Sequence, residues 1–356
     1  MGVPCVRVDR EAGEKTRQRL ADADLVADGY DIVVDDGLLY IPVTEPAAVP
    51  DDLVVVEFDA PVRESQTMPA DRLEFEPSYE RIGEVIVIDE DDPDRARAIA
   101  DAIVASDLPV RTVLNRASKI KGETRVRDWE VLAQLEEDTE SGRRPTEVVH
   151  REYGCEFLLD LAEVYFSPRL ATERHRVVEQ VRESGPDEER DNGSEGRADS
   201  SEQSPERVLD MFAGVGPFAV PIAKRGATVV GVDINPTAVG YLRENAKRNG
   251  VEDRITAIEG DVREVAADYE GWADRILMNL PHSADEFLDA AAAIAGDDCV
   301  LHYYDIQHED DPYGPGERAI RDAFEPQYDV TVETRHTVRS YAPHELNVVL
   351  DVRVTR

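Results

Sequence analysis

Cysteine, lysine and long apolar runs are scarce in this sequence, and each scarcity excludes a class of protein. Cys5, Cys155 and Cys299 are too few and too far apart for a disulfide framework or a zinc site, and the seven histidines show no ligand spacing. No apolar run of about 18 residues occurs, and the first residues lack a signal-peptide pattern. We therefore expect a soluble, cytoplasmic protein that binds no metal and no membrane.

Basic residues are also scarce relative to acidic ones. Asp and Glu total 77 against 40 Lys and Arg, and the formal net charge is −37. Such self-repulsion destabilises a compact chain in dilute buffer, whereas in molar salt the Debye length falls to about 3 Å and the repulsion is screened. The composition predicts a halophilic archaeal protein. It argues against a nucleic-acid partner, but molar salt also weakens the counterion-release contribution, so the partner stays open.

The most regular part of the chain is residues 208–281. Four short apolar runs, within 208–212, 228–232, 255–259 and 275–278, have the length of buried parallel strands, and helical patterns separate the first three. In the second interval Asn235 suits a helix N-cap, Pro236 suits the first helical position, and Gly250 closes the helix. This alternation predicts a doubly wound α/β sheet.

Acidic residues end three of these strands, where a ligand of such a sheet binds. The first turn contains Gly214-x-Gly216 but no third glycine, and it carries Asp210, which would repel a phosphate. Asp233 is placed to bind two ribose hydroxyls, and Asp261 to meet an adenine edge. These residues favour a nucleoside without phosphates, namely S-adenosylmethionine. The alternative is a dinucleotide-binding domain for NAD.

Three motifs resemble a known family. The segments Asp210–Phe218 (DMFAGVGPF), Met278–Pro281 (MNLP) and Ser167–Arg174 (SPRLATER) are similar to the archaeal and eukaryotic tRNA (guanine-37-N1)-methyltransferases, and the resemblance runs over most of the chain. It implies S-adenosylmethionine-dependent methylation of N1 of guanosine 37 in the tRNA anticodon loop. It also implies a class I methyltransferase domain preceded by smaller α/β RNA-binding domains, in a monomer.

The chain divides into four parts on this interpretation. Residues 1–62 form a small module, which in the resembled family contacts the tRNA elbow, and residues 63–80 form a linker. Residues 81–165 form a second, RNA-binding domain, and residues 166–356 form the methyltransferase domain. Within the latter, residues 183–206 are acidic and lack apolar periodicity, so we expect a disordered insertion.

The most basic stretch of the chain is residues 115–130. Two of the five lysines and three arginines lie there, beside Trp129. A basic loop next to an aromatic residue suits an RNA backbone and a stacked base. The alternative is that neighbouring acidic residues neutralise these cations.

Methylation of guanine N1 requires a base for the N1 proton and a donor where charge develops on O6. The resemblance implies Glu173 as the base, although an acid near a helix start can be purely structural, paired with Arg174. Arg127 is the expected O6 partner, with Arg125 the alternative. Asn279 would orient the guanine or the cofactor, and Pro281 would fix the turn. The residues that the resemblance places around the cofactor are Arg174, Asp233, Ile234, Asp261, Val262 and Asn279.

Two other functions fit the same fold. One is a later step of wyosine synthesis on guanosine 37, either carbon methylation or aminocarboxypropyl transfer. Asn279-Leu280-Pro281 and Glu173 argue against aminocarboxypropyl transfer. The other is a non-catalytic tRNA-binding protein, which would have no need of the acidic strand ends.

Overall fold

The computed structural model describes residues 2–63, 66–122, 124–135, 142–182 and 204–356, and it falls into two compact units. The first unit is Met1–Arg72 with Ala105–Asp107, and the second is Leu73–Val104 with Leu108–Arg356. Among the described residues, no helix is long and apolar enough to cross a membrane.

The first unit is a four-stranded sheet with one helix. Its elements are β1 (Val3–Asp9), α1 (Gly13–Asp22), β2 (Val33–Asp35), β3 (Leu38–Pro42) and β4 (Val54–Phe58), in the sheet order β2-β3-β1-β4. A tight turn joins β2 and β3, and its residues Asp36 and Gly37 both have positive φ, as such a hairpin turn requires. Strand β4 was not predicted.

The second unit begins with another four-stranded sheet. Its elements are β5 (Glu80–Ile82), β6 (Val85–Ile88), α2 (Pro93–Val104), β7 (Thr112–Arg116) and β8 (Trp129–Gln134), in the order β5-β6-β7-β8. Asp92 caps α2, since its side chain accepts hydrogen bonds from the backbone N–H groups of Asp94 and Arg95. Trp129, expected next to a basic loop, begins strand β8.

A hairpin connects this sheet to the larger one. Strands β9 (Glu147–Glu152) and β10 (Cys155–Asp160) pair across Gly154. Helix α5 (Pro236–Arg248) fixes the hairpin, because the Asn245 and Asn249 side chains bond to the backbone of Leu158 and Glu156. The predicted cap of α5 is also confirmed: Asn235 accepts from two backbone N–H groups.

The larger sheet has seven strands and confirms the predicted α/β class. They are β11 (Arg207–Asp210), β12 (Thr228–Asp233), β13 (Ile255–Glu259), β14 (Ala273–Met278), β15 (Ala295–His308), β16 (Asp329–Ala342) and β17 (Glu345–Thr355). Their order is β13-β12-β11-β14-β15-β17-β16. The first five are parallel, and β17 pairs antiparallel with both β15 and β16. The order in which strands are added reverses at β11, since β12 and β13 lie on one side of it and β14 and β15 on the other. This topology places a ligand crevice at the end of β11.

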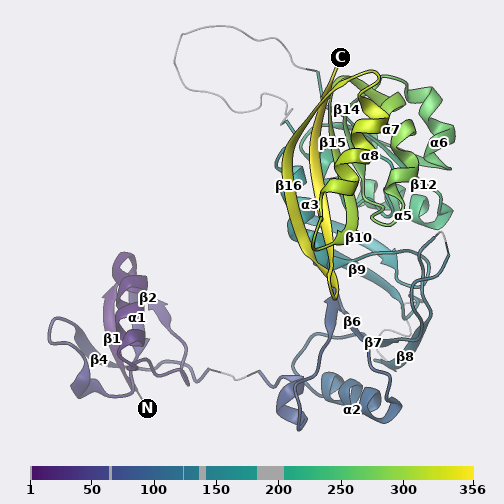
Figure 1. Ribbon diagram of the computed structural model, residues 1–356. Helices are drawn as coiled ribbons and strands as arrows, with labels where there is room; N and C mark the ends of the chain where they lie inside the picture. The colour runs from purple at the N-terminus through teal and green to yellow at the C-terminus, as the bar shows by residue number, and fades with distance from the viewer. Residues whose placement is uncertain (1, 64–65, 123, 136–141, 183–203) are drawn as a thin grey trace, which may run out of the picture. The chain divides into compact units, whose positions relative to one another are not determined.

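Helices cover both faces of this sheet (Figure 1). One face packs against α3 (Ala171–Val178), α4 (Ala219–Lys224) and α5, and the other against α6 (Val262–Val265), α7 (Leu288–Ile294) and α8 (Gly314–Phe324). A 3-10 turn, Ala284–Phe287, directly precedes α7. Consecutive strand residues contribute alternately to the two cores, so the sheet is buried on both sides.

The predicted disordered insertion lies mostly outside the described residues, at 183–203. The last residues of the predicted segment, 204–206, are described, and Glu206 is held in place. The predicted end of the insertion at residue 206 is therefore too late. The Glu206 side chain is 3% exposed and accepts a 2.7 Å hydrogen bond from Nε of Arg275 in β14. A charged side chain so buried needs an opposite partner, which a local composition pattern does not reveal.

Candidate active site

The glycine turn after β11 forms the floor of the candidate site. Gly214 and Gly216 have φ of 54° and 88°, in the left-handed region. A Cβ added at Gly216 would lie 2.4 Å from Cδ1 of Leu242, whereas one at Gly214 would have no atom within 4 Å. Gly216 therefore lets α5 pack closely, and Gly214 leaves open space above the turn.

Asp233, at the end of β12, braces this turn. Its Oδ2 accepts from the Gly214 N–H at 2.7 Å, and its Oδ1 from the Asn235 N–H at 2.9 Å. Burial raises the pKa of Asp233, and the two backbone hydrogen bonds oppose that rise. Each carboxylate oxygen keeps a free lone pair, which suits a pair of ligand hydroxyls.

Asp210, at the end of β11, has an unused polar atom. The residue is 1% exposed, and its Oδ2 has no hydrogen-bond partner among the described residues. Burial, with a smaller contribution from the nearby Asp233 charge, raises the pKa of Asp210 to about 7. A buried unpaired acid is costly, so this atom is suited to meeting a polar group of a bound ligand.

The residues that follow β12 and β13 differ in whether their side chains are available to a ligand. Ile234 is 47% exposed, beside Asp233, and offers an apolar surface to a flat ring. Asp261 is committed to its own helix: it accepts from the Arg263 N–H at 2.9 Å and pairs with the Arg263 guanidinium, which lowers its pKa. Val262, the first residue of α6, is buried. The described contacts thus leave Asp233 and Asp210 better placed than Asp261 to bind a ligand.

The loop after β14 closes another side of the site. Asn279 and Pro281 are half-buried, and the Asn279 amide forms no hydrogen bond with any described residue. His282 contacts the Tyr341 hydroxyl at 3.1 Å, and burial followed by the Arg125 charge lowers its pKa. Arg125 therefore acts electrostatically on the loop that carries Asn279.

Arg125 and Arg127 line one pocket with several aromatic rings. The lining residues are Glu80, Ile82, Val87, Arg116, Arg125, Val126, Arg127, Trp129, Leu161, Val164, Tyr165 and Phe166. Arg125 lies over Tyr165 and Arg127 over Trp129, at 5.4 and 5.6 Å from the ring centroids. Burial lowers the pKa of Arg127, and neither arginine has an ion-pair partner among the described residues.

The rest of the basic stretch is neutralised within the protein. Arg116 pairs with Glu80 and Asp89 at 2.9 and 3.0 Å, and Lys121 pairs with Asp128. The Trp129 ring nitrogen donates to the Leu161 carbonyl at 2.7 Å. The two predictions for this stretch therefore apply to different residues: acidic neighbours satisfy Arg116 and Lys121, and Arg125 and Arg127 remain available.

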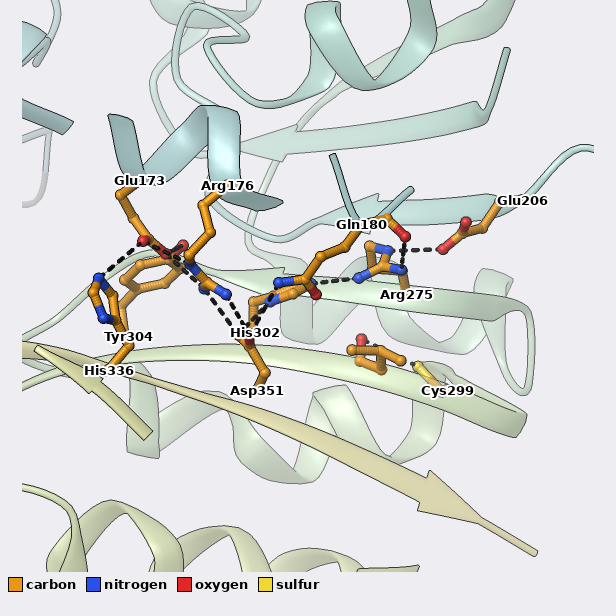
Figure 2. A network of polar contacts seen from close by, with 11 residues as sticks. Glu173, Arg176, Gln180, Glu206, Arg275, Cys299, His302, Tyr304, His336 and Asp351 are labelled. Carbon is orange, nitrogen blue, oxygen red and sulfur yellow. Dashed lines mark hydrogen bonds and ion pairs between the residues drawn. The ribbon is translucent and has the colours of Figure 1, made fainter. Parts of the chain in front are cut away.

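Glu173 lies in the first turn of α3, with its side chain 4% exposed. Its carboxylate accepts two hydrogen bonds from Arg176, both at 2.8 Å, and one from the Tyr304 hydroxyl at 2.7 Å (Figure 2). Tyr304 follows the register pair Met278–Tyr303, so it is level with Asn279 on the neighbouring strand. Glu173 is thus held at the carboxyl end of the parallel strands.

The alternative in which Glu173 pairs with Arg174 is wrong. Arg174 points elsewhere: it forms a double hydrogen bond with Glu152, at 2.8 and 2.5 Å, and donates to the Ser167 carbonyl. Successive helix residues point about 100° apart, whereas residues three apart are neighbours, which explains why Arg176 and not Arg174 reaches Glu173.

Residues around Glu173 that the sequence analysis missed come from the last strands of the sheet. They are Tyr304 of β15, His336 of β16 and Asp351 of β17, together with Arg176 of α3. A usable signal existed for Asp351, because a carboxylate within the apolar run 348–354 has to find a partner. Among the described residues no cluster of side chains has the composition of a metal site.

Three known families match the sequence. The family described as "TRM5/TYW2 methyltransferase domain" matches residues 148–186 and 189–331. The "tRNA methyltransferase 5 N-terminal domain" matches residues 5–51, and the "TYW2 N-terminal domain" matches residues 65–133.

Curated relatives align along nearly the whole chain. The tRNA (guanine(37)-N(1))-methyltransferase Trm5b of Pyrococcus abyssi is 37% identical over 363 residues, covering 98% of each chain. The enzyme of the same name from Methanocaldococcus jannaschii is 31% identical and covers 99% of each. A tRNA(Phe) (4-demethylwyosine(37)-C(7)) aminocarboxypropyltransferase of Pyrococcus horikoshii is 34% identical but covers 82% of this chain and 94% of its own.

Solved structures show the same likeness. Trm5b from P. abyssi superposes with a TM-score of 0.69 at 35% identity, covering 99% of this chain and 100% of that one. A structure described as the complex of aTrm5 and tRNALeu gives a TM-score of 0.66 at 29% identity, covering 99% of both. M. jannaschii TYW2 in complex with AdoMet gives 0.56 at 26% identity, covering 78% of this chain and all of that one. The fold, the glycine turn with its acidic strand ends and these full-length likenesses agree: the chain belongs to the TRM5/TYW2 methyltransferase family.

Proposed function

We propose that this protein transfers the methyl group of S-adenosylmethionine to N1 of guanosine 37 in tRNA. The observation that carries the proposal is full-length similarity to two enzymes of that activity, which extends through the first unit. The first unit also matches the tRNA methyltransferase 5 N-terminal domain at residues 5–51. It would contact the tRNA elbow.

Aminocarboxypropyl transfer in wyosine synthesis is less well supported. The two relatives named for that activity cover 82% and 78% of this chain, against 98% and 99% for the N1-methyltransferases. The chain also carries Asn279-Leu280-Pro281 and Glu173. A non-catalytic tRNA-binding protein is disfavoured because a buried, unpaired Asp210 would be costly without a ligand.

S-adenosylmethionine supplies an electrophilic methyl group, and the site has residues that fit its nucleoside. Asp233 would bind the ribose hydroxyls through its remaining lone pairs, and Ile234 would pack on the adenine ring. The open space above Gly214 and the orphaned Oδ2 of Asp210 leave room and a polar contact for the amino-acid end. Val262 and Asp261 would border the adenine. The guanidinium of Arg174 is committed to Glu152 and the Ser167 carbonyl, so Arg174 would contribute to the cofactor site only by fixing the start of α3.

The target guanine would enter between the loop after β14 and the arginine pocket. It has to leave the anticodon-loop stack to do so, at a cost of a few kcal/mol. Asn279, whose amide is uncommitted among the described residues, would orient the base, and Pro281 would fix the loop. Arg127 or Arg125 would donate to O6, where negative charge develops when N1 is deprotonated. Glu173 would accept the N1 proton.

The remaining assignments follow from this activity. The partner is tRNA, through the anticodon loop and the elbow, and the reaction takes place in the cytoplasm. We propose a monomer that needs no metal ion, because proton removal and charge stabilisation at O6 both have candidate side chains.

The decisive experiment is methylation of an unmodified tRNA transcript by the purified protein in molar KCl, with labelled S-adenosylmethionine. One transcript carries guanosine at position 37 and its control carries adenosine there. We expect N1-methylguanosine only with the first, identified by nucleoside mass spectrometry. Label in another nucleoside, or an aminocarboxypropyl mass shift, would contradict the proposal. Arg127→Ala and Arg125→Ala, assayed in parallel, identify the O6 donor by the larger loss of rate.

A further inference from the structure

A continuous chain of polar side chains, all buried except the 25% exposed Arg176, starts at Glu173 (Figure 2). It passes from Glu173 to Arg176, then to Asp351 and His302, and ends at Arg275 and Glu206. Each link is a hydrogen bond of 2.6 to 3.1 Å. Besides α3, the strands β14, β15 and β17 contribute residues, and Glu206 directly precedes β11. Buried ion pairs of this kind are often no more stabilising than apolar packing, so stability alone does not account for the arrangement.

Arg176 is shared between two carboxylates. Its Nε and Nη2 donate to Glu173, both at 2.8 Å, while its Nη1 and Nη2 donate to Asp351 at 2.6 and 3.1 Å. Asp351 is 2% exposed. Burial would raise the pKa of Asp351, but hydrogen bonds from His302 and Arg176 outweigh it and hold that pKa well below the usual range. Asp351 is therefore ionised and competes with Glu173 for one guanidinium.

The hydrogen bonds of His302 fix its protonation. Its Nε2 lies 2.6 Å from Nη1 of Arg275, and a guanidinium can only donate, so Nε2 is the acceptor. The hydrogen is then on Nδ1, which donates to Asp351 at 2.7 Å. Burial lowers the pKa of His302, in agreement with a neutral ring. His302 orients Asp351 without adding a positive charge to it.

Two carboxylates share one guanidinium at the Glu173 end of the chain. At the other end Glu206 pairs with Arg275 at 2.7 Å and with the more exposed Arg182 at 3.6 Å, which leaves Arg176 to serve both Glu173 and Asp351. Without Asp351, Arg176 would belong wholly to Glu173 and make its carboxylate a weaker base.

Two further groups face the Glu173 carboxylate. The Tyr304 hydroxyl of β15 donates to Oε1 at 2.7 Å, and burial together with the Glu173 charge raises the pKa of Tyr304 well above its usual value. Tyr304 therefore stays protonated and stabilises the ionised carboxylate. His336 of β16 approaches Oε2 at 3.8 Å and is 46% exposed.

We propose that Asp351 is a positioning residue for methyl transfer: it acts through Arg176 to keep Glu173 an effective base. Tyr304 has the opposite effect, because its hydroxyl stabilises the ionised carboxylate and so makes Glu173 a weaker base. This inference rests on the proposed function, in which Glu173 takes the proton from guanine N1. It assigns a role in the reaction to β17, whose Asp351 lies 175 residues from Arg176 in the sequence.

The test is the single-turnover rate of methyl transfer, measured from about pH 5 to pH 9 in molar KCl, because product release can mask the chemical step in kcat. For Asp351→Asn we expect the maximal single-turnover rate to fall about tenfold. The acidic limb of the pH–rate profile should also move to lower pH, because a weaker base is protonated only at lower pH. For Tyr304→Phe we expect the acidic limb to move to higher pH, since the carboxylate loses a donor. A purely structural network would not give shifts of opposite sign.

Three variants serve as controls. Asp274→Asn removes another carboxylate that pairs with an arginine, Arg207 at 2.8 Å, at the far end of β14, and it should leave the profile unchanged. His336→Gln removes the other ionisable side chain that faces Glu173, and the opposite shifts of Asp351→Asn and Tyr304→Phe should persist in its background. Glu173→Gln should lose turnover while it keeps its affinity for S-adenosylmethionine, measured by calorimetry.

The outcomes separate the inference from the proposed function. If the wild type forms no N1-methylguanosine, both fall. If it does, and the profiles of Asp351→Asn and Tyr304→Phe match that of the wild type or move in the same direction, only the inference falls. Should Asp351→Asn fail to fold, as judged by circular dichroism, Tyr304→Phe decides alone, because it keeps the ring and removes one hydroxyl.

Discussion

Asp210 is a single residue that links stability to ligand binding. It is buried at the end of β11 with one carboxylate oxygen unpartnered among the described residues, and burial raises its pKa to about 7. The folded protein therefore favours the neutral acid, and the unfolded chain the charged one. Functional sites commonly retain such unfavourable groups because a ligand uses them.

We expect Asp210→Asn to be more stable than the wild type at alkaline pH and weaker in binding S-adenosylmethionine. Since the folded pKa is raised, the stability that Asp210 contributes is present at low pH and is lost as pH rises from about 4 to about 7. The full rise of the Asp210 pKa above its ordinary value corresponds to about 4 kcal/mol of stability at most. Thermal unfolding between about pH 5 and pH 8 checks the sign, because the stability difference between variant and wild type should grow with pH.

Asp274→Asn is the matched control for that experiment. Burial alone would raise the pKa of Asp274, but Arg207 outweighs it and lowers that pKa. Asp274 therefore contributes stability at neutral pH, and its removal should destabilise the protein there. A stability gap for Asp210→Asn that stays constant with pH would show that the acid is not buried in a neutral form.

At the scale of single residues, the sequence revealed local roles better than distant ones. Asn235 as a helix cap and Asp233 at a strand end follow from their immediate neighbours, and the structure has both in place. Tyr304 and Asp351 could not be found this way, because they meet α3 from 131 and 175 residues away. Only the folded sheet brings them to Glu173.

At the scale of elements, the two glycines of the turn after β11 have separable tasks. Gly216 has φ of 88° and a Cβ there would collide with Leu242 of α5 at 2.4 Å. Gly214 has φ of 54°, and a Cβ there would project into open space. One glycine therefore serves packing between the turn and α5, and the other serves the ligand site.

Alanine substitution of each glycine tests this division. Gly214→Ala should cost about 1 kcal/mol of stability through its left-handed backbone and weaken cofactor binding strongly. Gly216→Ala should cost about 1–3 kcal/mol more than that, because the new methyl overpacks the contact with Leu242. Denaturant unfolding and calorimetric titration of S-adenosylmethionine on both variants provide the comparison. Equal losses of affinity with equal losses of stability would contradict the assignment.

Elements that are buried on both faces were the easiest to predict. The apolar runs of β11 to β14 and the capped helix α5 were recognised because period and caps agree. Strands β4, β5 and β8 were missed, since they are short or carry mixed polar residues. Trp129 is an instructive case: a basic, aromatic stretch indicated a loop, yet the register of β8 with β7 places this residue opposite Arg116.

For the whole molecule, the charge of −37 is the property that local structure does not explain. Many arginines are already paired, for example Arg19 with Asp52 and Arg353 with both Asp298 and Glu333. Exposed pairs of this kind contribute little, about 0–1 kcal/mol each. The excess of acidic side chains is therefore left to repel one another across the surface, and solvent ions have to screen it.

We expect the protein to lose its folded structure when KCl falls below roughly molar concentration, where the Debye length rises from about 3 Å towards 10 Å. Circular dichroism during stepwise dialysis measures the loss, and return of salt should restore the spectrum. Because the cause is screening, NaCl at equal ionic strength should replace KCl. Sucrose, which stabilises proteins by exclusion from their surface without screening charge, should not. An unchanged spectrum in dilute buffer, or full rescue by sucrose, would show that the acidic surface is tolerated without salt and that the halophilic interpretation is wrong.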